Sequence, residues 1–279
     1  GQAAAHSPGH PGIAMTDENT AELLIERHGP VAVLTLNRPQ AMNALSQSLI
    51  RSLSAAIVSL GRDETARVLV LTGAGERAFS AGLDLKELGA RPGLLGMVEG
   101  EGERPNPIRA IAECPKPVIA AVNGVAITGG FELALAGDIL IAAETARFAD
   151  THQRVGVIPG WGLSQKLSRI IGPSRAKEMA FSGRFISARQ ASDWGLVSRC
   201  VPAGDLMADV MALAQEIAEV DAAFLADYKR LVDVGYGLPY GEALGLETEW
   251  SRRHNAAVRP DELAARRAGV QAKGRSRES

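Results

Sequence analysis

The sequence predicts an α/β fold with a largely parallel sheet, followed by a helical C-terminal region. Short runs of β-branched and aliphatic residues alternate with helix-like stretches up to about residue 202, a pattern typical of parallel strands joined by helices. Beyond that point, four helix-like stretches follow one another without a strand candidate between them. A chain of 279 residues can bury the core of one such domain and carry an appended region.

The predicted elements begin with two strands, at residues 21–26 and 31–36, paired around the turn at 28–30. A helix follows, which Gly61 is expected to end. It is indicated by aliphatic side chains at helical spacing, namely Leu45, Leu49, Leu53, Ile57 and Leu60. Further strands are predicted at 68–71, 117–122, 139–142 and 197–201, and C-terminal helices at 205–220, 222–235, 240–255 and 261–268.

The ends and one internal segment have a different composition. Residues 1–14 lack a hydrophobic period and are expected to be a disordered leader or an expression remnant. Residues 89–107 combine glycines, prolines and mixed charges and are expected to form a mobile surface segment. The expected organisation is therefore a leader at 1–14, a core carrying the active site at 15–202 and a helical region at 203–279.

Charge and cysteine content limit the classes of partner. A formal net charge of -2 gives no reason to expect nucleic acid or an anionic membrane as a partner. No apolar run approaches the roughly 18 residues needed to span a bilayer. Cys114 and Cys200 do not form a CxxC pair, so free thiols in a reducing cytoplasm are expected, without a metal.

The segment RAFSAGLDLK at 77–86 is the first candidate for chemistry. Gly82 permits a backbone geometry that a Cβ resists, and Asp84 suits the first turn of a helix. The N–H group of Leu83 could then point at an anionic ligand atom. The plainer interpretation is a glycine-containing loop with a capping aspartate.

The second candidate is the segment at 118–138, where an apolar strand leads to Gly129-Gly130 and an alanine-rich helix. Such a helix start exposes free N–H groups, and glycines allow a ligand to come close. Glu132 lies in the first turn, where it either acts on the ligand or merely complements the helix dipole. The patterns GxGxxG and GxxxxGK[ST] of phosphate loops are both absent.

These two segments together resemble the paired signatures of the enoyl-CoA hydratase/isomerase (crotonase) superfamily. Three further motifs resemble the family in the same order, at 37–45 (NRPQAMNAL), 158–165 (IPGWGLSQ) and 182–197 (SGRFISARQASDWGLV). The resemblance runs from about Glu22 to Arg252. It implies a spiral of β-β-α turns with a C-terminal helical oligomerisation region, forming a trimer or a hexamer.

The resemblance also implies site residues. The N–H groups of Leu83 and Gly129 correspond to the family's oxyanion hole, which stabilises a thioester enolate. Glu132 corresponds to the first of two catalytic glutamates of the hydratases, whereas His152 stands at the position of the second. Gly160 corresponds to the glycine whose N–H helps to hold the catalytic water.

His152 is the main departure from the family pattern. It replaces the acid beside Glu132, or marks another reaction such as isomerisation or decarboxylation, or takes no part in catalysis. Asp150 is near enough in sequence to be a substitute acid. These alternatives stay open at the level of sequence.

The expected function is hydration of a 2-enoyl-CoA thioester, with coenzyme A as part of the substrate and no separate cofactor. The alternatives are an isomerase, a decarboxylase or a weakly active acyl-CoA-binding paralogue. The residues expected to bind acyl-CoA are Ala81, Leu83, Asp84, Leu85, Lys86, Gly129 and Trp161. Arg38 is a weaker candidate for phosphate contact, since it is more simply a solvated surface residue.

Overall fold

The computed structural model describes residues 21–90 and 104–277. By its internal contacts the chain divides into two units, the first ending at Glu219 and the second beginning at Val220. The expected leader at 1–14 and most of the expected surface segment at 89–107 lie outside the described residues.

The first unit is built on a six-stranded sheet in the order β1-β2-β3-β5-β7-β10. The first two strands are antiparallel, and all later neighbours are parallel. Its strands are β1 (Leu23–His28), β2 (Val31–Leu36), β3 (Val68–Gly73), β5 (Val118–Val122), β7 (Ile139–Ala143) and β10 (Arg199–Val201). All of these were predicted, and β2, β3, β5 and β7 carry aliphatic runs that are largely buried between the layers on both faces of the sheet. The outer strands β1 and β10 are more exposed.

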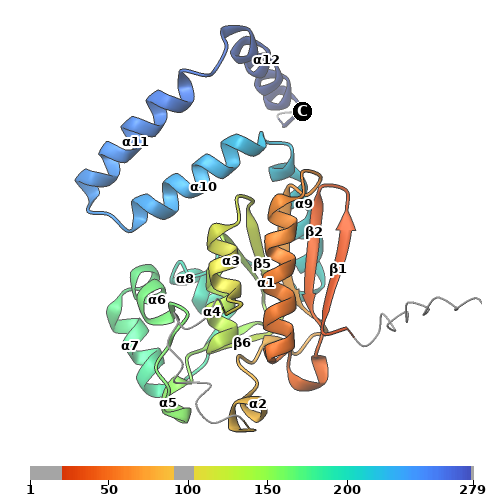
Figure 1. Cartoon of the computed structure of the whole chain (residues 1–279), viewed down its shortest axis with the longest axis vertical. Coiled ribbons are helices and arrows are strands. Elements are labelled where there is room, and N and C mark those ends of the chain that lie inside the picture. Colours follow the sequence, from red (N-terminus) through yellow and green to blue (C-terminus); the bar gives the residue numbers. More distant parts are fainter. Residues whose placement is uncertain (1–20, 91–103, 278–279) are drawn as a thin grey trace, which may run out of the picture. The chain divides into compact units, whose positions relative to one another are not determined.

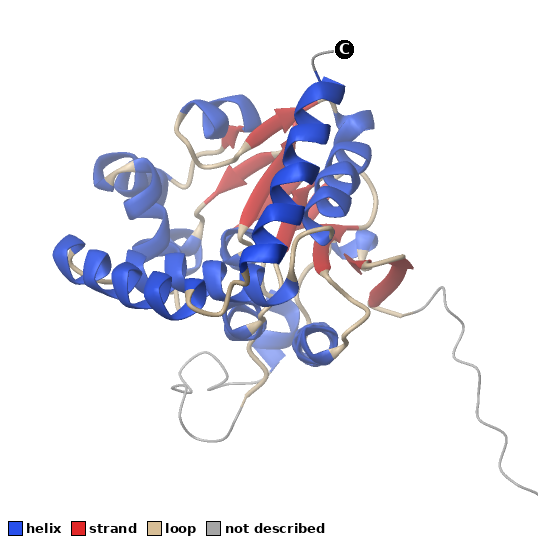
Figure 2. Cartoon of the chain, turned by 90° about the horizontal axis from the view of Figure 1, so that it is seen from above, coloured by secondary structure: helices blue, strands red, loops and turns tan. Residues whose placement is uncertain are grey.

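Helices cover both faces of this sheet (Figures 1 and 2). Helix α1 (Gln47–Arg62) packs on one face through Leu49, Leu53 and Ile57. Helix α9 (Leu206–Ala218) packs on the other, where its apolar side chains meet alternate residues of the strands, such as Val33 and Val70. The division by contacts therefore falls after Glu219 rather than after residue 202, since α9 buries its apolar side chains against the sheet.

Helix α1 extends one residue past the expected stop at Gly61, so that prediction of its end is wrong. The Nζ atom of Lys116 donates to the carbonyl oxygens of Leu60, at 2.5 Å, and of Asp63. A cation at these last carbonyl groups satisfies the helix end without a left-handed glycine.

A second sheet of four short strands, in the order β4-β6-β8-β9, lies in the same unit. Its strands are β4 (Ala78–Ser80), β6 (Val125–Ile127), β8 (Arg147–Ala149) and β9 (Ile186–Ser187). Periodicity did not predict them, because two or three residues are too few to show it. This sheet carries the segments from which the candidate site is built.

Helix α4 (Gly129–Ala136) joins the two sheets, since it begins directly after β6 and ends before β7. Its buried Phe131 contacts Phe148 of β8, with ring centroids 5.2 Å apart. The remaining helices of this unit are α2 (Leu85–Ala90), α3 (Pro107–Glu113), α5 (His152–Val155), α6 (Leu163–Ile171), α7 (Pro173–Ser182) and α8 (Ala188–Asp193), with short 3-10 turns at Pro39–Ala41 and Ala203–Asp205.

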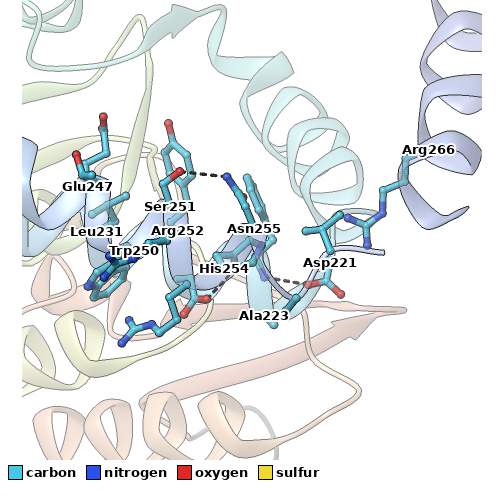
Figure 3. A pocket seen from close by; sticks show the side chains of 17 residues that line it. Asp221, Ala223, Leu231, Glu247, Trp250, Ser251, Arg252, His254, Asn255 and Arg266 are labelled. Atoms are coloured by element: carbon cyan, nitrogen blue, oxygen red, sulfur yellow. Dashed lines mark hydrogen bonds and ion pairs between the residues drawn. The ribbon is translucent and has the colours of Figure 1, made fainter. Parts of the chain in front are cut away.

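The second unit consists of α10 (Ala222–Tyr236), α11 (Tyr240–Asn255) and α12 (Pro260–Arg277), and its described residues include no strand, as predicted. A pocket of about 1000 Å³ lies among these helices. Figure 3 shows its lining, in which the Nδ2 atom of Asn255 donates to Ser251. His254 lies on Asp227 at 3.2 Å and edge-on to Phe224.

Candidate active site

Two backbone N–H groups, those of Leu83 and Gly129, lie side by side at the start of α4. Leu83 forms a parallel bridge with Leu45, in which Leu45 bonds to the carbonyl of Gly82 and to the amide of Asp84. The N–H of Leu83 therefore points away from Leu45. Among the described residues, the structure shows no acceptor for it or for the N–H of Gly129.

Glycines allow this close approach. Gly82 has a φ of +91°, and a Cβ placed on it would lie 3.0 Å from the nitrogen of Gly129. A Cβ on Gly129 would lie 3.4 Å from the nitrogen of Leu83. A Cβ on Gly130 would lie only 2.1 Å from the carbonyl oxygen of Ser80, so Gly130 is required for packing against β4.

Helix α4 directs its positive end to the same place, because Gly129 is its first residue. Thr128, just before it, has a φ of 53°, which is unusual for a residue with a branched Cβ. Its hydroxyl accepts from the N–H of Thr151 at 3.0 Å and lies 2.7 Å from the Thr151 hydroxyl. The start of α4 is thereby tied to the segment that carries Asp150 and His152.

Glu132 is not a solvent-facing residue that only complements the helix dipole, since the residue is 5% exposed. Its Oε1 atom accepts from the N–H groups of Trp161, at 2.9 Å, and Leu163, at 3.3 Å. Burial raises the pKa of this carboxyl group, although the two N–H groups and the nearby His152 act in the opposite direction. A buried carboxylate that accepts protons more readily suits acid–base chemistry.

His152 and Asp150 complete the polar cluster. The Nε2 atom of His152 lies 4.0 Å from Oε2 of Glu132. Its Nδ1 atom lies 2.7 Å from Oδ1 of Asp150, and both residues are buried. From the sequence, Asp150 was predicted only as a substitute acid. The presence of an aspartate two residues before a histidine could have pointed to this pair, but that spacing does not show that the two side chains meet.

The loop at 156–163 closes this cluster through its backbone. Trp161 packs partly against the core, while its N–H holds Glu132. Gly160 comes directly before it and is exposed. Beside this loop, a pocket of about 470 Å³ has a wall that includes Asp150, His152 and Leu163.

The segment from Ala81 to Lys86 was expected to bind acyl-CoA, and its side chains differ in their contacts and exposure. The Asp84 carboxylate accepts from Nη1 of Arg38 at 2.9 Å and from the N–H of Lys86 at 3.1 Å. Burial acts against ionisation of Asp84, yet these hydrogen bonds lower its pKa overall. Leu85 is 58% exposed, and Lys86 is exposed as well.

Arg38 is neither a solvated surface residue nor available for a phosphate. Its side chain is 16% exposed, and its guanidinium group pairs with Glu22 as well as with Asp84. A buried asparagine that the sequence did not single out, Asn43, accepts from the N–H of Arg38 and donates to the carbonyl groups of Ala74 and Ala78. These contacts hold the loop before Leu83.

The described part of the chain has no group of three or more His, Cys, Asp or Glu side chains arranged to hold a metal ion. Cys114 is buried and Cys200 half-buried, and neither forms a disulfide bond within the described part of the chain. None of the described helices is both long and apolar enough to cross a membrane.

Fold and site together define a class of α/β protein in which two backbone N–H groups lie side by side at a helix start, in the same unit as the buried polar side chains of Glu132, Asp150 and His152. Residues 26–250 match the family described as enoyl-CoA hydratase/isomerase. The chain belongs to this family, which confirms the family and the fold class predicted from the sequence.

Individual relatives agree with this assignment. A probable enoyl-CoA hydratase from Rhizobium meliloti is 40% identical, with 81% of this chain and 86% of that protein covered. An enoyl-CoA hydratase subunit I structure from Geobacillus kaustophilus has a TM-score of 0.81 at 32% identity and covers 91% of this chain and 96% of its own. A monofunctional enoyl-CoA isomerase from M. smegmatis has a TM-score of 0.69 at 36% identity, covering 80% and 98%.

Proposed function

We propose that this chain hydrates a 2-enoyl-CoA thioester, and that the thioester oxygen binds between the N–H groups of Leu83 and Gly129. The observation that carries the proposal is the buried pair of Glu132 and His152, whose Oε2 and Nε2 atoms are 4.0 Å apart. Glu132 lies in the first turn of α4, the helix that begins with Gly129. The names of its relatives as enoyl-CoA hydratases support the same reaction.

The amides account for stabilisation of the intermediate. Addition at the β-carbon of the enoyl group turns the thioester into an enolate, whose oxygen becomes negatively charged. Two preorganised donors and the start of α4 lower the energy of that charge, and one such donor contributes about 3 kcal/mol in comparable sites. Since neither N–H has a protein acceptor among the described residues, both are available to the substrate.

The distance between Glu132 and His152 fits a reacting water. At 4.0 Å, Oε2 and Nε2 are too far apart for a direct hydrogen bond. A water oxygen at about 2.8 Å from each atom would bridge them at about a right angle. In the proposed step, Glu132 takes one proton of this water as its oxygen bonds to the β-carbon, and the imidazolium of His152 gives a proton to the α-carbon. Transfer of the proton from Glu132 to His152 then restores both groups.

Two further parts belong to the same proposal, namely the binding of acyl-CoA and the assembly of the chain into a trimer or a hexamer through its C-terminal helices. The loop from Ala81 to Lys86 lines the acyl-CoA, with the backbone of Leu83 and the exposed side chains of Leu85 and Lys86 nearest to it. Gly160 and Trp161 border the water and the acyl group. No cofactor beyond the coenzyme A of the substrate is expected. A cytoplasmic location stays a prediction, since one relative is named peroxisomal and another mitochondrial.

A spectrophotometric assay on short-, medium- and long-chain 2-enoyl-CoAs tests the proposal, because hydration removes the absorbance of the conjugated double bond. Isomerisation of 3-enoyl-CoA is the second candidate, which the likeness to the mycobacterial isomerase favours. It would instead create that absorbance. Binding of acyl-CoA without turnover of either substrate would contradict both and indicate a silent paralogue.

A further inference from the structure

The carboxyl group of Asp150 has no role in the reaction as described so far. We infer that Asp150 is a positioning residue, which holds one proton of His152 on Nδ1 and so makes Nε2 the atom that exchanges protons with water and substrate. The inference rests on the proposed hydration, because that reaction gives His152 a proton to transfer.

Two hydrogen bonds to one oxygen fix the imidazole ring. Oδ1 of Asp150 lies 2.7 Å from Nδ1 of His152 and 3.2 Å from the backbone nitrogen of the same residue. A carboxylate only accepts, so Nδ1 must donate in this arrangement. Hydrogen bonds to an ionised carboxylate are also stronger than those between neutral groups.

The second ring nitrogen is thereby given a defined direction and state. Nε2 faces Glu132 at 4.0 Å. With the proton of the neutral ring on Nδ1, Nε2 carries a lone pair, and it becomes a donor only after it has received a proton. Proton release and uptake by His152 therefore use the same atom, the one nearest to Glu132.

The surroundings make this arrangement rigid. Asp150 is 3% exposed, and the pair lines the pocket of about 470 Å³ together with apolar side chains such as Val157 and Leu163. A hydrogen bond is stronger in such apolar surroundings, and a buried polar group that loses its hydrogen-bond partner there is more destabilising. The neighbouring Thr151 is bonded to Thr128, so the pair is held at a fixed place relative to the Gly129 N–H.

The test is NMR of the full-length protein labelled with ¹⁵N-histidine, without substrate, with the His152 signal assigned from His152→Gln. At a pH where the ring is neutral, the wild type should show Nδ1 protonated and Nε2 unprotonated. In Asp150→Asn the amide group can turn to donate to Nδ1, which moves the proton to Nε2. That variant should lose about a hundredfold in kcat, with little change in KM.

The chain offers a matched control in its second His–Asp pair. Asp227→Asn makes the same chemical change beside His254, whose Nδ1 lies 3.2 Å from that carboxylate in the helical unit. It should leave both kcat and the His152 signals unchanged. A general effect of removing an aspartate beside a histidine would appear in both variants.

A wild-type His152 with its proton on Nε2 would overturn the inference, even if Asp150→Asn failed to fold. So would a loss of kcat in Asp150→Asn without the change of tautomer, or that change without a loss of kcat. Failure of the proposed function gives a different result. In that case the wild type hydrates no 2-enoyl-CoA, while the NMR signals still report where the proton of His152 lies.

Discussion

At the scale of single residues, the proposed site differs from the two-glutamate site that the family resemblance implies, because His152 stands at the position of the second glutamate. Glu132 keeps the place of the first carboxylate, and the structure adds what holds it, namely the N–H groups of Trp161 and Leu163. Facing it is an imidazole backed by Asp150. The chemistry of the site therefore depends on two different kinds of titrating group.

Glu132→Gln should remove nearly all activity, with a fall in kcat of at least about 10²-fold, because the change removes the group proposed to take the proton of the water. The fold should persist, since an amide oxygen can still accept from Trp161 and Leu163. Steady-state kinetics on crotonyl-CoA, with circular dichroism as a check of folding, measure this. Full activity of this variant would show that the catalytic assignment is wrong.

The raised pKa of Glu132 also predicts how stability depends on pH. Burial makes the folded state hold this proton to a higher pH than the unfolded chain, whose ordinary value is 4.5. Folding then favours the protonated form, so this contribution to stability is complete below pH 4.5 and is lost as pH rises through the folded-state pKa.

Glu132→Gln has no ionisable group at this position, so its stability should not show the decrease with rising pH that Glu132 causes in the wild type. Its free energy of unfolding relative to the wild type should therefore increase between acidic and neutral pH. Urea unfolding of both proteins across that range measures the difference. A difference that decreased with pH would mean that the carboxylate form is the one stabilised by folding.

His152 variants separate the interpretations left open by the sequence. His152→Ala should lower kcat by about a hundredfold or more if the imidazole transfers a proton. His152→Glu should raise crotonyl-CoA hydration if the second carboxylate is what limits it. An unchanged rate in His152→Ala would leave His152 without a part in catalysis.

At the scale of elements, the site depends on short pieces of backbone brought together by the second sheet. Strand β6 leads into α4, and β8 leads into Asp150 and His152. Their parallel pairing places both carboxyl ends at the same edge. A hydrogen bond from Thr128 to the carbonyl of Ala149 continues this contact past the strands.

Gly129→Pro tests the contribution of α4 directly. Proline is tolerated at the first position of a helix, so the change removes one N–H while the helix can remain. We expect a fall in kcat of about 10²- to 10³-fold, the effect of losing one oxyanion donor. Gly129→Ala keeps the N–H and is the control, with its Cβ 3.4 Å from the Leu83 nitrogen. Undiminished turnover by the proline variant would contradict the placement of the thioester oxygen.

At the scale of the whole molecule, most of the large apolar side chains that are exposed among the described residues lie in the helical unit after Glu219. Tyr236, Tyr240 and Leu263 are 59%, 79% and 61% exposed. Exposed apolar surface of this kind is typical of an interface between subunits. It supports the proposal that the C-terminal helices assemble a trimer or a hexamer.

Light scattering of the full chain at micromolar concentration measures this assembly. The expected mass is three or six times the 29.3 kDa of one chain. A mass of one chain would contradict the proposal. Raising the salt concentration should change the mass little, because burial of apolar surface is not screened by ions.

Much of the larger sheet could be predicted, because β2, β3, β5 and β7 each bury a run of aliphatic side chains that is visible in the sequence. The helices after residue 205 could be predicted because their sequences are helix-like and contain no strand candidate. The position of α9 could not be predicted. Its apolar face could pack on a sheet as well as on another helix, and only the tertiary structure shows that it packs on the sheet.

The sequence by itself determined the family, the two glycine-rich segments and the identity of Glu132 and His152, because these depend on residue types in a fixed order. Only the tertiary structure decided which groups meet. The adjacency of the Leu83 and Gly129 amides, the ion pair of Arg38 with Asp84 and the bond between Asp150 and His152 all arise from contacts between elements or from side-chain directions. Such contacts depend on distances in space, which residue spacing along a chain does not specify.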